Sequence, residues 1–185
     1  MTRPREQNDE LKITSEAEML ALGRDFAAQI LADHDNPHIV FELIGDVGAG
    51  KTTFTRGLAE GLKVKEPVTS PSFTISKRYA FSSPRNGQTA QLIHYDFYRL
   101  DDPGIMRDEL AEALAEPNAV IVVEWGGDVA DLLPANKTRL EISLQEDGSR
   151  LVKIIKTANT SKPAKTAEAA NPSNLVGVSQ PKEQK

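Results

Sequence analysis

The residues with the clearest chemical meaning form a glycine-rich segment, GDVGAGKT, that runs from Gly45 to Thr52. It matches the phosphate-binding pattern G-x-x-x-x-G-K-[ST]. Glycines allow such a loop to turn its backbone N–H groups inward, toward an anion at the start of a helix. In this pattern Lys51 reaches the β- and γ-phosphates, and the hydroxyl of Thr52 binds Mg²⁺. The spacing therefore predicts a nucleotide site.

Phosphoryl chemistry also needs a carboxylate on the far side of the metal and a group that places the nucleophile. Two apolar segments lead directly into a carboxylate: residues 119–123 precede Glu124, and residues 92–95 precede Asp96. Ligands bind at the carboxyl ends of strands in open α/β sheets, so both carboxylates are candidates. The alternative for each is a strand-end carboxylate that faces solvent or pairs with a nearby cation.

A hydroxyl-rich loop follows the predicted phosphate site. It spans residues 68–75 and offers the hydroxyls of Thr69, Ser70, Ser72 and Thr74 around Pro71. The switch segments that sense the γ-phosphate in GTPases occupy this position, although an ordinary Ser/Thr/Pro turn has the same composition. Trp125 directly follows Glu124 and either borders a nucleotide or caps the core.

The three histidines carry no metal-binding spacing. His34 and His38 flank a turn, and His94 alternates with its neighbours in a predicted strand. For each of them, burial or solvent contact is the expected role rather than metal ligation. Mg²⁺ on a nucleotide is therefore the only metal that the sequence implies.

The elements that must position these residues follow from hydrophobic patterning. Ser15–Glu18 has the form of a capping box, and the apolar residues after it recur at helical spacing: Met19, Leu22, Phe26 and Ile30. An apolar segment of strand length, 38–44, leads into the glycine loop, and a second helix is expected from Lys51 to about Gly61.

The remainder of the chain predicts more strands than helices. The expected elements are a hairpin-like pair on either side of residues 82–87, a helix starting at 101–103, a buried parallel strand at 119–123, and a terminal hairpin from 138–144 and 150–155. This order predicts an α/β fold like that of P-loop NTPases, with a mostly parallel central sheet flanked by helices and an antiparallel hairpin portion.

Composition limits the classes of protein that need to be considered. The chain has 185 residues, with 22 Lys and Arg against 27 Asp and Glu, so a role in coating nucleic acid through bulk charge is disfavoured. The absence of Cys excludes a disulfide partner, a thiolate nucleophile and a cysteine metal site. No apolar run approaches the roughly 20 residues of a membrane helix, so a soluble, cytoplasmic protein is expected.

Changes in amino-acid composition divide the chain into three parts. Residues 1–12 are polar and are expected to form a flexible leader. Residues 13–156 are expected to form a single P-loop domain. From 157 to 185, Thr, Ala, Asn, Ser, Pro and Lys dominate, so this low-complexity tail is expected to be disordered.

Four segments in this order and spacing resemble the TsaE family, the small bacterial ATPases of tRNA threonylcarbamoyladenosine (t6A) biosynthesis: 45–53, 68–74, 94–100 and 122–125. The resemblance covers about residues 13–155. The chain departs from the family pattern at 108–112, where a Gly-Leu-Asp/Glu signature often stands. It departs again at Gly126 and Gly127, which follow the tryptophan.

The resemblance implies specific roles. Lys51, Asp96 and Glu124 would be catalytic, with Asp96 at the γ-phosphate or its attacking water. Thr52 and Glu124 would hold the metal. The residues implied to bind nucleotide are Gly45, Asp46, Val47, Gly48, Ala49, Gly50, Lys51, Thr52, Thr53, Thr69, Trp125 and Glu16.

The resemblance also implies a weak, Mg²⁺-dependent ATPase that acts with the TsaB–TsaD pair and meets tRNA only through that complex. Two alternatives remain open. A small-molecule kinase would be expected to carry an Arg-rich helical lid, and none is evident. A nucleotide-dependent switch that binds GTP would need N-K-x-D, whereas residues 136–139 read NKTR, which favours ATP.

Overall fold

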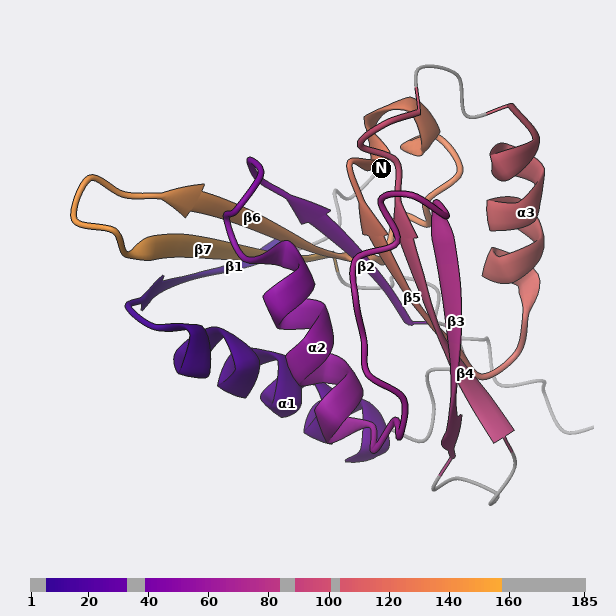
Figure 1. The fold of residues 1–185 in the computed structure, drawn as a ribbon, viewed down its shortest axis with the longest axis horizontal. Coiled ribbons are helices and arrows are strands. Elements are labelled where there is room, and N and C mark those ends of the chain that lie inside the picture. The colour runs from indigo at the N-terminus through magenta and orange to yellow at the C-terminus, as the bar shows by residue number, and fades with distance from the viewer. Residues whose placement is uncertain (1–5, 33–38, 84–88, 101–103, 158–185) are drawn as a thin grey trace, which may run out of the picture.

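The computed structural model describes residues 6–32, 39–83, 89–100 and 104–157. These residues form one seven-stranded sheet with helices on both faces (Figure 1). The elements in chain order are β1 (Glu6–Ile13), α1 (Glu16–Ala32), β2 (Ile39–Ile44), α2 (Lys51–Gly61), β3 (Ser76–Ser82), β4 (Thr89–Asp96), α3 (Gly104–Ala115), β5 (Ala119–Glu124), the short 3-10 helix η1 (Gly126–Val129), β6 (Thr138–Leu144) and β7 (Arg150–Thr157).

The strand order is β1-β7-β6-β2-β5-β4-β3. The central strands β6, β2, β5 and β4 run parallel, whereas β3 at one edge and β7 and β1 at the other are antiparallel to their neighbours. This arrangement confirms the predicted α/β fold with a mostly parallel centre and antiparallel hairpins. The parallel strands bring their carboxyl ends to one edge of the sheet, where open α/β sheets bind ligands.

The sheet separates two buried hydrophobic clusters, one on each of its faces. Helices α1 and α2 cover one face of the sheet, and α3 covers the other (Figure 1). Three aromatic rings pack edge to face between these helices and the sheet: Phe26 of α1, Phe41 of β2 and Phe54 of α2. On the other face, Ile121, Val123 and Leu110 belong to a second buried cluster. Strand β5 is buried at every residue, as expected for a central parallel strand.

Residues 6–12 do not form the flexible leader that their polarity predicts. They belong to β1, which pairs antiparallel with the whole length of β7, from Glu6 opposite Thr157 to Ile13 opposite Arg150. An edge strand is held by main-chain hydrogen bonds and needs few buried side chains, so its composition gives little sign of it. Residues 1–5 and the tail after Thr157 lie outside the described residues.

The predicted capping box at the start of α1 is only half confirmed. The Ser15 hydroxyl accepts a hydrogen bond from the Glu18 N–H at 3.2 Å, as expected. The Glu18 carboxylate, however, accepts the backbone N–H of Thr14 at 2.6 Å, one residue before the N–H that the box predicts. This hydrogen bond holds the pKa of Glu18 below its usual value.

Within the described ranges, every helix is too short or too polar to cross a membrane.

Candidate nucleotide site

The glycine loop joins β2 to α2 in the predicted place. Gly50 is the N-cap of α2 with φ of 111°, in the left-handed region, and it offers no side chain to cap the helix. The first N–H groups of α2 are therefore left for a ligand. Gly45 closes the other end of the loop, where a Cβ would lie 2.3 Å from the carbonyl oxygen of Ile142. Backbone geometry thus requires glycine at both ends of the loop.

The Lys51 ammonium lies inside the loop. Its Nζ donates to the carbonyl oxygens of Gly45 at 2.6 Å and Asp46 at 2.9 Å, and it lies 4.3 Å from the centre of the Trp125 ring. Burial lowers the pKa of Lys51, and the carboxylates of Glu124, Asp96 and Asp46 oppose that shift. An ammonium has three donors, so the two loop carbonyls leave one for an anion.

Thr52 and Glu124 meet across the site. The Thr52 hydroxyl donates to Glu124 Oε1 at 3.2 Å, and Glu124 is 2% exposed. Glu124 ends β5 beside Leu43 of β2, whose chain continues into the glycine loop. The parallel register of these strands therefore brings a residue 72 positions away in the sequence to the start of α2.

Asp96 lies beside Glu124 because the two end the neighbouring strands β4 and β5 in register. Its Oδ2 accepts hydrogen bonds from the hydroxyls of Ser70 and Ser72, and its Oδ1 accepts the N–H of Tyr98 at 3.1 Å. The hydroxyl-rich loop is thus fastened to Asp96.

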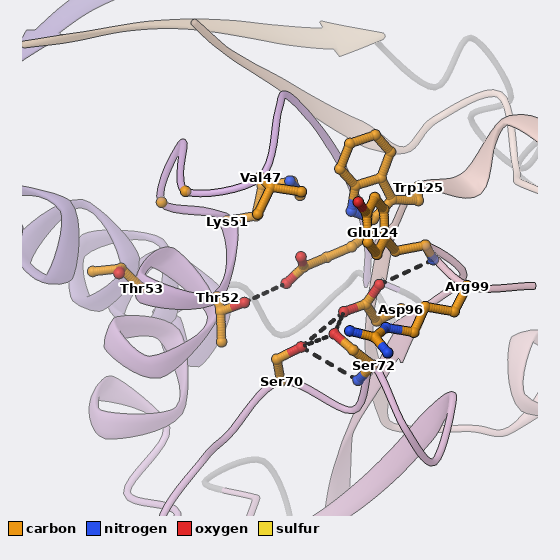
Figure 2. A pocket seen from close by; sticks show the side chains of 13 residues that line it. Val47, Lys51, Thr52, Thr53, Ser70, Ser72, Asp96, Arg99, Glu124 and Trp125 are labelled. Carbon is orange, nitrogen blue, oxygen red and sulfur yellow. Dashed lines mark hydrogen bonds between the residues drawn. The ribbon is translucent and has the colours of Figure 1, made fainter. Parts of the chain in front are cut away.

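These groups surround one pocket of about 360 Å³. Figure 2 shows the Thr52 and Glu124 side chains pointing toward each other, with Asp96 beside them and the two serines below. The residues that line the pocket are Val47, Gly48, Gly50, Lys51, Thr52, Thr53, Ser70, Ser72, Asp96, Tyr98, Arg99, Glu124 and Trp125.

Five residues that the resemblance placed at the nucleotide do not line this pocket, and two of them, Thr69 and Glu16, have other partners. Thr69 donates its N–H to the Tyr79 hydroxyl, accepts Lys77 Nζ at 2.6 Å, and lines a neighbouring cavity. The Glu16 carboxylate pairs with Arg56 at 2.9 Å. The other three act through the loop backbone: Gly45 and Asp46 offer carbonyls to Lys51, and Ala49 donates its N–H to the Asp46 carbonyl.

Sequence reasoning left several neighbours of the site without a role. His94 is fully buried, and its Nε2 lies 2.8 Å from Glu124 Oε1. The Tyr98 ring lies 4.9 Å from that of Trp125, and Arg99 lies 4.5 Å from the exposed ring of Phe73. The signal for His94 was its place two residues before Asp96, because alternate residues of a strand share a face.

Comparisons with known proteins identify a family. A family model described as "Threonylcarbamoyl adenosine biosynthesis protein TsaE" matches residues 13–152. The chain belongs to the TsaE family.

Similar proteins carry the same description. The chain is 35% identical to the tRNA threonylcarbamoyladenosine biosynthesis protein TsaE of Bacillus subtilis over 71% of this chain and 78% of that protein. It is 30% identical to the Haemophilus influenzae TsaE over 81% of this chain and 90% of that protein. The crystal structure of Bacillus subtilis YdiB matches with a TM-score of 0.61 and 28% identity, covering 83% of this chain and 88% of that one. The chain is thus a t6A biosynthesis protein with a P-loop site.

Proposed function

We propose that the chain is a Mg²⁺-dependent ATPase that serves t6A biosynthesis together with TsaB and TsaD. The observation that carries the proposal is the convergence of Lys51, Thr52, Asp96 and Glu124 on one pocket at the start of α2. No single one of these groups is diagnostic. Together they are the parts that phosphoryl transfer needs: an anion cradle, a metal-side pair and a group to orient water.

The residues fit a nucleotide phosphate chain. The free N–H groups at the start of α2 would bind phosphate oxygens, and the partial positive charge of the helix end would favour them. The remaining donor of Lys51 would hold the terminal phosphates. The face of Trp125 lies against the same ammonium, so it keeps Lys51 in the loop rather than in solvent.

The donor set also fits Mg²⁺. Thr52 and Glu124 supply a hydroxyl and a carboxylate, the hard oxygen ligands that this ion prefers, and phosphate oxygens complete such sites. Within the described ranges, no cluster of three or more acidic or histidine side chains could hold a metal without the nucleotide. When bound, Mg²⁺ would neutralise charge on the phosphates.

Asp96 would orient the attacking water. Asp96 is 3% exposed, and its carboxylate is held through both oxygens by Ser70, Ser72 and the Tyr98 N–H. A carboxylate held in this way keeps a fixed direction toward the pocket, and fixed direction is what hydrolysis of a terminal phosphate requires of it.

An exposed apolar rim supports a partner-dependent role. Val47 is 69% exposed, Tyr98 50% and Phe73 85%, and these residues lie at or beside the mouth of the pocket. Exposed apolar groups gathered at one site are typical of a surface that another protein covers. We assign this partner as TsaB–TsaD, the pair that the family resemblance implies, with tRNA contacted through the complex in the cytoplasm. The relatives are named for tRNA threonylcarbamoyladenosine biosynthesis.

ATP hydrolysis by the purified chain, alone and with TsaB and TsaD from the same source, tests the proposal. We expect slow, Mg²⁺-dependent turnover that rises when the pair is added. No nucleotide binding at all would overturn the proposal. Phosphorylation of a small molecule, with no response to TsaB and TsaD, would replace it with the kinase alternative.

A further inference from the structure

His94 is a buried polar side chain for which the proposed hydrolysis has no direct use. It lies on β4, fully buried, between the apolar Ile93 and Tyr95 on the opposite face. Among the described residues its Nε2 has one partner, Glu124 Oε1 at 2.8 Å, and its Nδ1 has none. A buried nitrogen without a hydrogen bond costs free energy, so an apolar residue would serve the core better.

The contact between His94 and Glu124 helps to set the orientation of the Glu124 carboxylate. Its Oε1 accepts hydrogen bonds from both the His94 ring and the Thr52 hydroxyl. Its other oxygen, Oε2, has no donor among the residues that the structure describes. Two donors from different elements, β4 and α2, therefore fix one oxygen of the carboxylate and leave the second free.

We propose that His94 is a positioning residue that holds the Glu124 carboxylate against Thr52, in the direction needed to support Mg²⁺ on the nucleotide. The inference rests on the proposed function. The imidazole donates from Nε2–H, and this tautomer leaves Nδ1 as the unpaired acceptor. Carboxylates that face a metal commonly need such an outer hydrogen bond, and its removal costs about 10- to 100-fold in metal affinity or activity.

A matched pair of variants separates positioning from packing. His94→Leu fills the space without a donor, whereas His94→Gln places an amide N–H near the position of Nε2. We expect His94→Leu to need at least about tenfold more Mg²⁺ for half-maximal binding of the ATP analogue AMP-PNP, with binding in the absence of metal unchanged. We expect His94→Gln to recover most of that loss.

A control on the same strand accounts for general destabilisation. Tyr95→Phe removes a buried hydroxyl that donates to Glu109 on the other face of the sheet. We expect this variant to lower thermal stability without moving the Mg²⁺ dependence. If His94→Leu and His94→Gln lose equal stability while Mg²⁺ dependence stays at the wild-type value in both, the proposal is overturned.

A second readout needs neither nucleotide nor metal. Because the chain has only three histidines, a long-range proton–nitrogen NMR spectrum can identify the ring of His94. We expect hydrogen on Nε2 and none on Nδ1, and a shift of the Nε2 signal in Glu124→Gln. The opposite tautomer would refute the proposed hydrogen bond.

The outcomes distinguish the two proposals. A wild-type chain that binds no Mg²⁺–AMP-PNP overturns the proposed function, and the positioning role with it. A wild-type chain that binds, together with a His94→Leu variant whose Mg²⁺ dependence is unchanged, overturns the positioning role alone.

Discussion

At the scale of single residues, Lys51 shows how burial and nearby carboxylates act in opposite directions on a cation at the candidate site. Lys51 is 5% exposed, and burial lowers the pKa of its ammonium group. Glu124, Asp96 and Asp46 act in the opposite direction and favour the charged form. The loop carbonyls of Gly45 and Asp46 hold the ammonium at the site before any ligand arrives, so little rearrangement is needed on binding.

The first prediction concerns Lys51→Ala. It removes a charged donor, and hydrogen bonds to charged groups contribute about 1.5–3 kcal/mol, so nucleotide affinity should fall about 10- to 100-fold. Calorimetric titration with AMP-PNP and Mg²⁺ measures the nucleotide affinity of the variant and of the wild-type protein. Lys12→Ala is the control, because Lys12 is an exposed lysine that pairs with Asp147. Equal losses in both variants would contradict the role assigned to Lys51.

The second prediction concerns Glu124→Gln, which keeps the size of the side chain and removes its charge. Nucleotide should still bind, because the loop, Lys51 and the α2 N-terminus remain intact. Turnover should fall by about 100-fold or more, the range found when one electrostatic group is removed from an assembled site. Steady-state ATPase assays beside binding titrations separate the two effects. Unchanged turnover would exclude Glu124 from the metal-side role.

At the scale of elements, glycines let α1 and α2 approach closely, and α2 begins at the candidate nucleotide site. A Cβ on Gly57 would lie 2.2 Å from the carbonyl oxygen of Leu20, and a Cβ on Gly23 would lie 2.4 Å from that of Phe54. Backbone atoms cannot rotate away as a side chain can. The position of α2, and so of Lys51 and Thr52, depends on this close helix pair.

The third prediction is that Gly57→Ala destabilises the protein by about 1–3 kcal/mol, the usual cost of overpacking. Higher helix propensity of alanine offsets only part of this loss. Gly127→Ala is the control, because a Cβ there would meet nothing within 4 Å. Denaturant unfolding gives the free energy of unfolding of both variants and of the wild-type protein. A Gly57→Ala protein as stable as wild type would show that the helices are farther apart than described.

The fourth prediction concerns acid stability at the start of α1. The Thr14 N–H lowers the folded-state pKa of Glu18 from 4.5, so the ionised carboxylate stabilises the fold above that pH. This contribution is lost as the pH falls through the lower folded-state value. When the pH is lowered from 6 to 3, the Glu18→Gln variant should therefore lose less thermal stability than the wild-type protein. Thermal unfolding at each pH measures this difference. Glu146→Gln, which removes a carboxylate from an exposed turn, is the control for the change in net charge.

At the scale of the whole molecule, one edge strand of the sheet, β1, comes from the start of the chain. β1 pairs with β7, and β7 pairs with β6, so the first and last described elements are neighbours. Ile13, at the end of β1, enters the main core cluster. Residues 6–13 are therefore part of the folded unit.

The fifth prediction compares two truncations. Removal of residues 1–13 strips β1 from β7 and should lower the thermal midpoint by about 5 °C or more, since each kcal/mol shifts it by about 2–4 °C at this chain length. Removal of residues 158–185 should shift it by less than about 2 °C, because their composition offers little apolar surface to bury. Similar shifts for both would mean that the tail also packs on the domain.

The sequence by itself determined the phosphate loop, the helix that follows it and most strands of the sheet. These features depend on local spacing: the glycines, Lys51 and Thr52 lie within one short segment, and hydrophobic periodicity extends over single elements. Glu124 and Asp96 were predictable as strand-end carboxylates, since parallel strands place such ends together.

Only the tertiary structure decided which side chains meet. Glu124 contacts Thr52 and His94 across sequence separations of 72 and 30 residues, and Asp96 accepts hydrogen bonds from Ser70 and Ser72. It also decided that the polar residues 6–12 belong to a strand. These outcomes depend on which strands pair and in which register, and that pairing joins segments far apart in the sequence, beyond the reach of spacing within a single element.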